Sequence, residues 1–252
     1  MENENKYTIK SLQKALDIID CFSLEEPELS MPMLQRRLNM DKTSIYRILV
    51  NLEERGILQR NPLTGHFRLG VIMLQYARIC RAKLELREIA MPYIRELASR
   101  TEETVIINAV QENRGICIER INGPSEINII ADLGRTVPLL RGASGKGLAA
   151  FLPDEKIKAI YEAEKAQLNL SYEEIMYQVQ DIRTKGYVIS FGEQTPGTFG
   201  FACPIYDEDG KVNYALAVIG PAFRATEEHI KLIMELVPEC AMKISEGMGY
   251  RK

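Results

Sequence analysis

The order of short apolar patterns in the first seventy residues constrains the fold more than any other feature of this sequence. Helical spacing of apolar residues occurs at 11–22, 31–38 and 43–56, and two strand patterns, "ILQR" and "HFRL", follow on either side of "NPLTG". The Asn, Pro and Gly of that segment are typical turn residues. Three short helices followed by a hairpin is the element order of a winged helix-turn-helix, whose third helix enters the major groove of DNA.

The same patterns predict which helix faces are buried. Ser30 is a suitable N-cap for the second helix, and Gly56 is placed to end the third. The first helix is expected to bury Leu12, Ala15, Leu16 and Ile19. The third helix is expected to bury Ile45, Ile48, Leu49 and Leu52.

The third helix and the hairpin carry the candidate DNA contacts. Although the formal net charge of the chain is −3, residues 31–70 hold seven Lys and Arg against three Asp and Glu, a local balance of +4. Side chains outside the apolar helix face can bond to bases or phosphates, and basic side chains at the hairpin can hold the DNA backbone. The predicted DNA-binding residues are Arg36, Lys42, Thr43, Ser44, Tyr46, Arg47, Asn51, Arg60, His66 and Arg68. The alternative is an ordinary amphipathic surface helix with a solvated charged face.

Beyond residue 70 the sequence first predicts a helical region and then both strands and helices. A helical region over 71–99, with a break near "RAKLEL", precedes strand patterns at "TVIINAV", "GICIERI", "EINIIAD", "YVIS", "FGFACPIY" and "KVNYALAVIG". A helical stretch from "RGASGKG" to about residue 185 separates the third pattern from the fourth, and a closing helix is expected over 226–246. The stripe of Ile72, Tyr76 and Ile79 marks 71–82 as a candidate dimer-forming helix, with packing inside one subunit as the alternative.

Several segments resemble the IclR family of bacterial transcription regulators. "SLQKALDIIDCF", "KTSIYRILVNLEERGIL" and "TGHFRLG" are similar to its DNA-binding domain, and "VPLLRGASGKGLAAFLP", "IRTKGYVIS" and "PGTFGFACPIYDEDGKVNYALAVIGP" to its C-terminal half. The resemblance implies an α+β protein: an N-terminal winged helix-turn-helix domain (1–70), a helical linker (71–100) and a GAF-like antiparallel-sheet domain that senses a ligand (101–252). It also implies a homodimer or homotetramer, a palindromic double-stranded DNA operator, and a small-molecule effector such as an organic acid or an aromatic catabolite.

The glycine-rich segment "RGASGKG" does not match a nucleotide-binding loop. A P-loop requires G-x-x-x-x-G-K-[ST], but Leu140 stands where the first Gly is needed, and Gly147 follows Lys146 in place of Ser or Thr. The segment instead predicts a tight turn at a helix start, where backbone N–H groups attract anions. Glycines that serve only helix–sheet packing are the alternative.

The resemblance implies an effector pocket beside this turn. In the first of the two late strands, Gly200 and Ala202 share one face, and Phe199, Phe201 and Cys203 share the other. In the next strand, Ala217 and Ile219 share a face. Family members often carry an acidic residue before the first of these strands, a place that Glu193 occupies. The implied effector-binding residues are Gly142, Ala143, Ser144, Glu193, Thr198, Gly200, Ala202, Ala217 and Ile219. Because Ala217 and Ile219 stand where some relatives have hydroxyls, a less polar pocket is expected.

The cysteines, the histidines and the hydropathy of the chain argue against several other classes of function. The five cysteines form no C-x-x-C pair and the chain has only two histidines, so neither a metal site nor a cofactor is expected. A thiol-based redox sensor or reductase using Cys117 and Cys203 is the alternative function, but neither histidine lies close to them in sequence to activate a thiol, and no enzyme is expected. The polar first residues and the lack of an apolar run of about 18 residues predict a cytoplasmic protein with no membrane partner.

Overall fold

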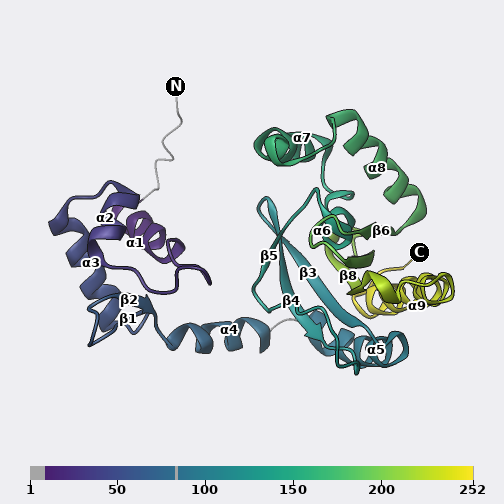
Figure 1. Ribbon diagram of the computed structural model, residues 1–252, viewed down its shortest axis with the longest axis horizontal. Coiled ribbons are helices and arrows are strands. Elements are labelled where there is room, and N and C mark those ends of the chain that lie inside the picture. Colours follow the sequence, from purple (N-terminus) through teal and green to yellow (C-terminus); the bar gives the residue numbers. More distant parts are fainter. Residues whose placement is uncertain (1–8, 83–84, 252) are drawn as a thin grey trace. The chain divides into compact units, whose positions relative to one another are not determined.

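The computed structural model describes residues 9–82 and 85–251, and the chain divides into two compact units, 1–83 and 84–252. The first unit has three helices, α1 (Lys10–Asp20), α2 (Met31–Leu38) and α3 (Lys42–Glu54), followed by the hairpin of β1 (Leu58–Arg60) and β2 (Phe67–Leu69) (Figure 1). Helix α4 (Ile72–Ala82) comes after the hairpin. The winged helix-turn-helix expected from the sequence is confirmed.

Capping side chains explain where α2 and α3 begin and end. The Ser30 hydroxyl accepts a hydrogen bond from the Met33 N–H (3.4 Å), and the Asp41 carboxylate accepts one from the Ser44 N–H (2.8 Å). Gly56 follows α3 with φ +69°, a left-handed conformation that costs glycine little. The helices and the hairpin then enclose one core of Ile18, Leu29, Leu34, Ile45, Leu49, Leu52, Leu58 and Phe67.

Helix α1 buries a different face from the expected one. Leu12 and Leu16 are 55% and 53% exposed, whereas Ile18 is fully buried and Ala15 and Ile19 are partly buried. The apolar stripe of α1 is wider than the surface that α2 and α3 cover, so only one side of the stripe is packed. The expected burial of Leu12 and Leu16 is therefore wrong.

In the second unit, six strands within residues 85–251 form one antiparallel sheet. They are β3 (Thr104–Gln111), β4 (Arg114–Ile121), β5 (Thr136–Pro138), β6 (Val188–Phe191), β7 (Thr198–Tyr206) and β8 (Val212–Pro221), in the spatial order β5-β4-β3-β8-β7-β6. This is the antiparallel sheet of the expected α+β fold, and it places the late strand β8 between β3 and β7 near its centre.

Helices cover both faces of this sheet (Figure 1). Buried side chains of α5 (Glu85–Thr101) and α9 (Glu227–Gly247) form one core with one face. Those of α6 (Gly142–Ala149), α7 (Asp154–Glu164) and α8 (Tyr172–Lys185) form another core with the opposite face. Along β7, Phe199, Phe201 and Cys203 belong to the first core and Ala202 to the second, so the expected alternation is confirmed.

Between β4 and α6, one expected strand is absent and one strand that was not expected is present. Residues 126–132 form no strand, because side chains hold their backbone: Arg224 Nη1 donates to the Ile127 carbonyl (2.8 Å) and Arg120 Nη1 to the Ala131 carbonyl (3.1 Å). The short strand β5, which pairs with β4, was not expected. The expected break near "RAKLEL" includes residues 83–84, which lie outside the described residues.

Candidate functional site

The exposed face of α3 carries most of the predicted DNA contacts. Its apolar face is packed in the core through Ile45, Leu49 and Leu52, which leaves the opposite face at the surface. No Asp or Glu occurs between residues 42 and 52, so this part of the helix has no carboxylate to repel a phosphate. The exposed residues on it are Lys42, Thr43, Tyr46, Arg47 and Asn51, and Ser44 is partly buried.

The predicted DNA-binding residues of the hairpin differ in their exposure and in the contacts that their side chains make within the protein. Arg60 Nε donates to the Gly65 carbonyl (3.3 Å), and its guanidinium lies 5.7 Å from the centre of the Phe67 ring, so Arg60 braces the hairpin turn. Arg68 is exposed and donates to the Gln59 side chain (3.2 Å). His66 is partly buried. On α2, Arg36 is exposed, with its Nε bonded to the Pro32 carbonyl (3.3 Å).

A groove between α1 and α3 brings further positive charge to this region. Its lining includes Lys10 and Lys14 of α1 as well as Arg47 and Asn51 of α3. Sequence reasoning did not select the two lysines, because the spacing within α1 does not show which of its faces adjoins α3. Only the packing of the two helices brings them beside the residues expected to meet DNA.

The second unit contains a cavity at the start of α6. About 70 Å³ is available there to the centres of water-sized molecules, against roughly 10–15 Å³ needed for one water. Seven of the implied effector-binding residues line it, namely Gly142, Ala143, Ser144, Glu193, Thr198, Gly200 and Ile219. Ala202 and Ala217 do not line it. They are fully buried under α6, where a Cβ on Gly147 would lie 3.3 Å from the Cβ of Ala202, so they contribute to the packing beneath α6 and not to the lining of this cavity.

The N-terminus of α6 is occupied by a carboxylate of the same chain. Glu193 accepts a hydrogen bond from the Gly142 N–H (3.0 Å), and the buried Lys146 ammonium lies 2.7 Å and 2.6 Å from its two oxygens. Gly142 has φ +73°, and a Cβ on Gly145 would lie 2.1 Å from the Pro138 carbonyl oxygen. The segment "RGASGKG" therefore serves a close helix–strand approach, and Lys146 neutralises Glu193 at the rim of the cavity.

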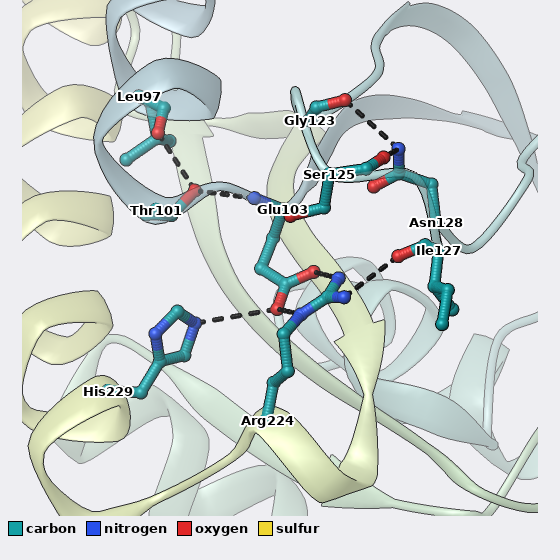
Figure 2. Close-up of polar contacts among 9 residues, drawn as sticks. All are labelled: Leu97, Thr101, Glu103, Gly123, Ser125, Ile127, Asn128, Arg224 and His229. Atoms are coloured by element: carbon teal, nitrogen blue, oxygen red, sulfur yellow. Dashed lines mark hydrogen bonds and ion pairs between the residues drawn. The ribbon is translucent and has the colours of Figure 1, made fainter.

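A buried ion pair holds the loop that forms another wall of the cavity. Glu103 is fully buried, and Arg224 binds its carboxylate through two contacts of 2.8 Å and 2.6 Å, with His229 Nε2 3.5 Å away (Figure 2). The same guanidinium donates to the Ile127 carbonyl. The residues that follow Ile127, including Ile130, line the cavity. Arg224 thus connects the wall of the cavity to the start of β3.

Further lining residues were not selected from the sequence. They include Asn108 of β3, Cys117 of β4, Ser190 of β6 and Arg135. Asn108 is the one polar residue between Val105 and Val110 in a strand pattern, and that signal was available. The others come together only through strand pairing and through the path of the loop before β5.

The two cysteines of the redox alternative are not activated. Burial raises the pKa of the Cys117 thiol to about 11, and burial also raises the pKa of Cys203. They belong to cores on opposite faces of the sheet, and of the two only Cys117 lines the cavity. Because a thiolate is the reactive form, this environment does not favour thiol chemistry.

Metal-binding clusters and membrane-spanning helices are absent from residues 9–82 and 85–251. No group of three or more His, Cys, Asp or Glu side chains in these segments is arranged to hold a metal ion. No helix in them is long and apolar enough to cross a membrane.

Comparison with known proteins agrees with this architecture. Residues 80–246 match the family model described as bacterial transcriptional regulator IclR C-terminal, and residues 11–62 match the IclR helix-turn-helix domain. The HTH-type transcriptional regulator KipR of Bacillus subtilis is 29% identical, covering 99% of this chain and 100% of its own. The match is full-length on both sides.

Solved structures share the fold at lower identity. A putative IclR regulator from a Silicibacter species aligns with a TM-score of 0.84 at 22% identity, covering 96% of this chain and 97% of its own. An IclR homologue of Microbacterium hydrocarbonoxydans, solved in complex with 4-hydroxybenzoate, aligns with a TM-score of 0.76 at 21% identity, covering 94% and 98%. This chain belongs to the IclR family of bacterial transcriptional regulators, with a helix-turn-helix DNA-binding domain and a C-terminal effector-binding domain.

Proposed function

We propose that this protein binds a palindromic operator as a homodimer or homotetramer, through α3 and the hairpin, and that a small effector in the cavity changes its operator affinity. The observation that carries the proposal is the exposed face of α3, with its basic and amide side chains and no carboxylate between residues 42 and 52. In a winged helix-turn-helix this helix enters the major groove.

The side chains on α3 have the chemistry that this role requires. Arg47 can bond bidentately to guanine and Asn51 to adenine, while Lys42 and Thr43 near the start of the helix can contact phosphates. Arg68 on the hairpin and the lysines of α1 add charge around the helix. Base contacts select the sequence and phosphate contacts supply much of the affinity.

The effector acts by linkage between the cavity and the operator. A ligand that binds one arrangement of paired DNA-binding domains more tightly than another shifts the population toward it, and operator affinity changes accordingly. The homologue solved with 4-hydroxybenzoate supports a small organic ligand for this fold. A ligand in the cavity acts on two parts of its wall. These are the loop fixed by Arg224 and the ion pair of Glu193 with Lys146 at the rim.

A second subunit is needed to read both halves of a palindrome, and α4 is the proposed contact. Tyr76 and Ile79 of the expected stripe are exposed in the single chain, and Ile72 is partly buried. Exposed apolar side chains at helical spacing favour packing against a second copy over packing inside one subunit.

Substitution of Arg47 tests the DNA-binding proposal. Arg47→Ala is expected to weaken operator binding by about 1–3 kcal/mol, the cost of one good base contact, with specificity relaxed at that base pair. Arg55→Ala is the matched control, because it removes the same exposed charge at the C-terminal end of α3, away from the base edges. Affinity is measured by fluorescence anisotropy on an operator selected from random duplexes. Equal losses in the two variants would contradict a reading role for Arg47.

A further inference from the structure

The amide of Asn108 is buried without a partner in the cavity floor. Asn108 on β3 is 0% exposed, and among the described residues neither its Nδ2 nor its Oδ1 has a hydrogen-bond partner. Its cross-strand neighbours do not supply one: Ala215 has no polar side-chain atom, and the Cys117 thiol donates to the Glu119 carbonyl (3.5 Å). The side chain lines the cavity together with Ile106 and Cys117.

Leaving such an amide unpaired is costly. A buried donor or acceptor without a partner lowers the stability of the folded state by about 1–3 kcal/mol, the cost of removing it from water. An apolar side chain of the same shape would not carry this desolvation cost. Buried polar groups in proteins are almost always satisfied. The strand around Asn108 is otherwise apolar, so a leucine there would serve packing better. The amide therefore points to something that enters the cavity.

Two other polar side chains of the cavity, Glu193 and Thr198, are already engaged. Glu193 is bound by Gly142 and Lys146, and the Thr198 hydroxyl donates to the Thr195 carbonyl (2.7 Å). Arg135, also in the lining, is exposed. Asn108 is thus a polar group at the buried end that remains open to a ligand.

The buried end of the cavity favours a neutral ligand group. The ionisable lining residues are Cys117, Arg135 and Glu193. Of these, Glu193 is neutralised by Lys146, Arg135 is exposed, and burial holds the Cys117 thiol protonated by raising its pKa to about 11. Burying an uncompensated charge beside Asn108 would be expensive. A carboxamide side chain offers two N–H donors and one carbonyl acceptor side by side.

We propose that Asn108 anchors the effector by a pair of hydrogen bonds to a neutral amide-type group, a carboxamide, ureido or lactam group, at the buried end of the ligand. The proposal rests on the effector-binding role proposed above and names the ligand chemistry of that site. Any acidic group of the effector then lies toward Arg135 and the start of α6, at the open side. The donor and acceptor of the ligand pair with the acceptor and donor of Asn108.

Small probes test this chemistry on the full chain. Propionamide and methylurea are compared with propionate, which has the size of propionamide but carries a charge. Binding is followed by saturation-transfer NMR and by the shift in Tm, since a ligand stabilises the folded state by mass action. The two neutral probes are expected to bind and raise Tm, and propionate to bind more weakly or not at all. Stronger binding of propionate than of propionamide would overturn the proposal, as would no binding of either neutral probe.

Variants at Asn108 separate a ligand anchor from a structural residue. Asn108→Leu removes the unpaired amide, so the Tm of the free protein is expected to stay or rise while the Kd of propionamide rises about tenfold or more, as two neutral hydrogen bonds are lost. Asn108→Ala gives the same loss without added volume. Asn213→Leu, an exposed asparagine on β8, is the control and should leave the Kd unchanged.

The possible failures are distinguishable. If Asn108→Leu lowers Tm and leaves the Kd of propionamide unchanged, Asn108 is a structural residue, for example one bound to a trapped water, and the proposal is overturned while the regulator function stands. Operator affinity measured without any probe tests DNA binding separately. If propionamide binds through Asn108 but operator affinity never responds to any cavity ligand, the anchor is supported and the proposed linkage fails.

Discussion

Two carboxylates of the second unit are neutralised in contrasting settings. Glu103 is fully buried and depends on Arg224, whereas Glu193 lies at the cavity rim and has both Lys146 and a backbone N–H as partners. A buried charge pair is costly to break, because the remaining charge stays without water or a partner. Each pair also fixes one part of the cavity. Arg224 holds the loop that forms its wall, and Glu193 holds the start of α6.

Removing Arg224 is expected to destabilise the protein strongly. Arg224→Met removes the guanidinium partner of Glu103 and frees the Ile127 carbonyl, and the free energy of unfolding should fall by about 3–5 kcal/mol. The measurement is urea unfolding followed by circular dichroism. Arg100→Met breaks an exposed pair with Glu96 and should cost less than about 1 kcal/mol. The double change Glu103→Leu with Arg224→Met should recover part of the loss, and no recovery would argue against an electrostatic cause.

At the scale of elements, α6 shows how glycine spacing positions a site. The helix lies so close to β5 that Gly145 has no room for a Cβ, while Gly147 faces the small side chain of Ala202 on β7. This close approach sets the start of α6 beside the cavity, with Ala143 and Ser144 in its lining. The alternatives left open by the sequence, pocket or packing, are therefore both part of the structure, at different residues of one segment.

Two alanine substitutions in α6 should differ sharply. In Gly145→Ala the new Cβ would meet a backbone oxygen at 2.1 Å, so α6 must move, and a loss of about 1–3 kcal/mol is expected from overpacking. In Gly147→Ala the nearest atom lies at 3.3 Å, and the gain in helix propensity of about 0.8–1 kcal/mol offsets the crowding. Thermal unfolding of both variants checks the difference. Equal stability of the two would show that α6 tolerates displacement from β5.

At the scale of the whole molecule, the proposed function requires coupling between the DNA-binding domain and the cavity through an oligomer. A dimer presents two α3 helices to two half-sites, and it also gives the effector two arrangements to distinguish. Operator affinity should fall steeply as salt rises, because binding releases counterions from the phosphates. In the proposed function, reading a whole palindrome is therefore a property of the dimer and not of a single chain.

Charge placed on the exposed stripe of α4 tests this assembly. Tyr76→Glu with Ile79→Glu should shift the protein toward monomer in analytical ultracentrifugation, and operator affinity should drop because each half-site is then bound alone. Ala77→Glu is the control, since residue 77 is exposed on the same helix but outside the stripe of Ile72, Tyr76 and Ile79. A stable dimer in the double variant would show that the subunits contact each other through another surface.

Much of the architecture was predictable because it rests on local chemistry. Ser30 caps the start of α2 and the left-handed Gly56 follows the end of α3, and alternation along β7 assigns its two faces. The exposed face of α3 follows directly from the position of its apolar residues. The failure of "RGASGKG" as a nucleotide loop likewise followed from two residues, Leu140 and Gly147.

Tertiary contacts decided the rest. The segment 126–132 looked like a strand but is held as a loop by Arg120 and Arg224, the latter 97 residues from Ile127. Ala202 lies under α6 and not in the cavity, while Asn108, passed over in the sequence, lies in its floor. Sequence patterns report the periodicity of one element at a time, whereas a cavity is a gap between elements whose position depends on how they pack.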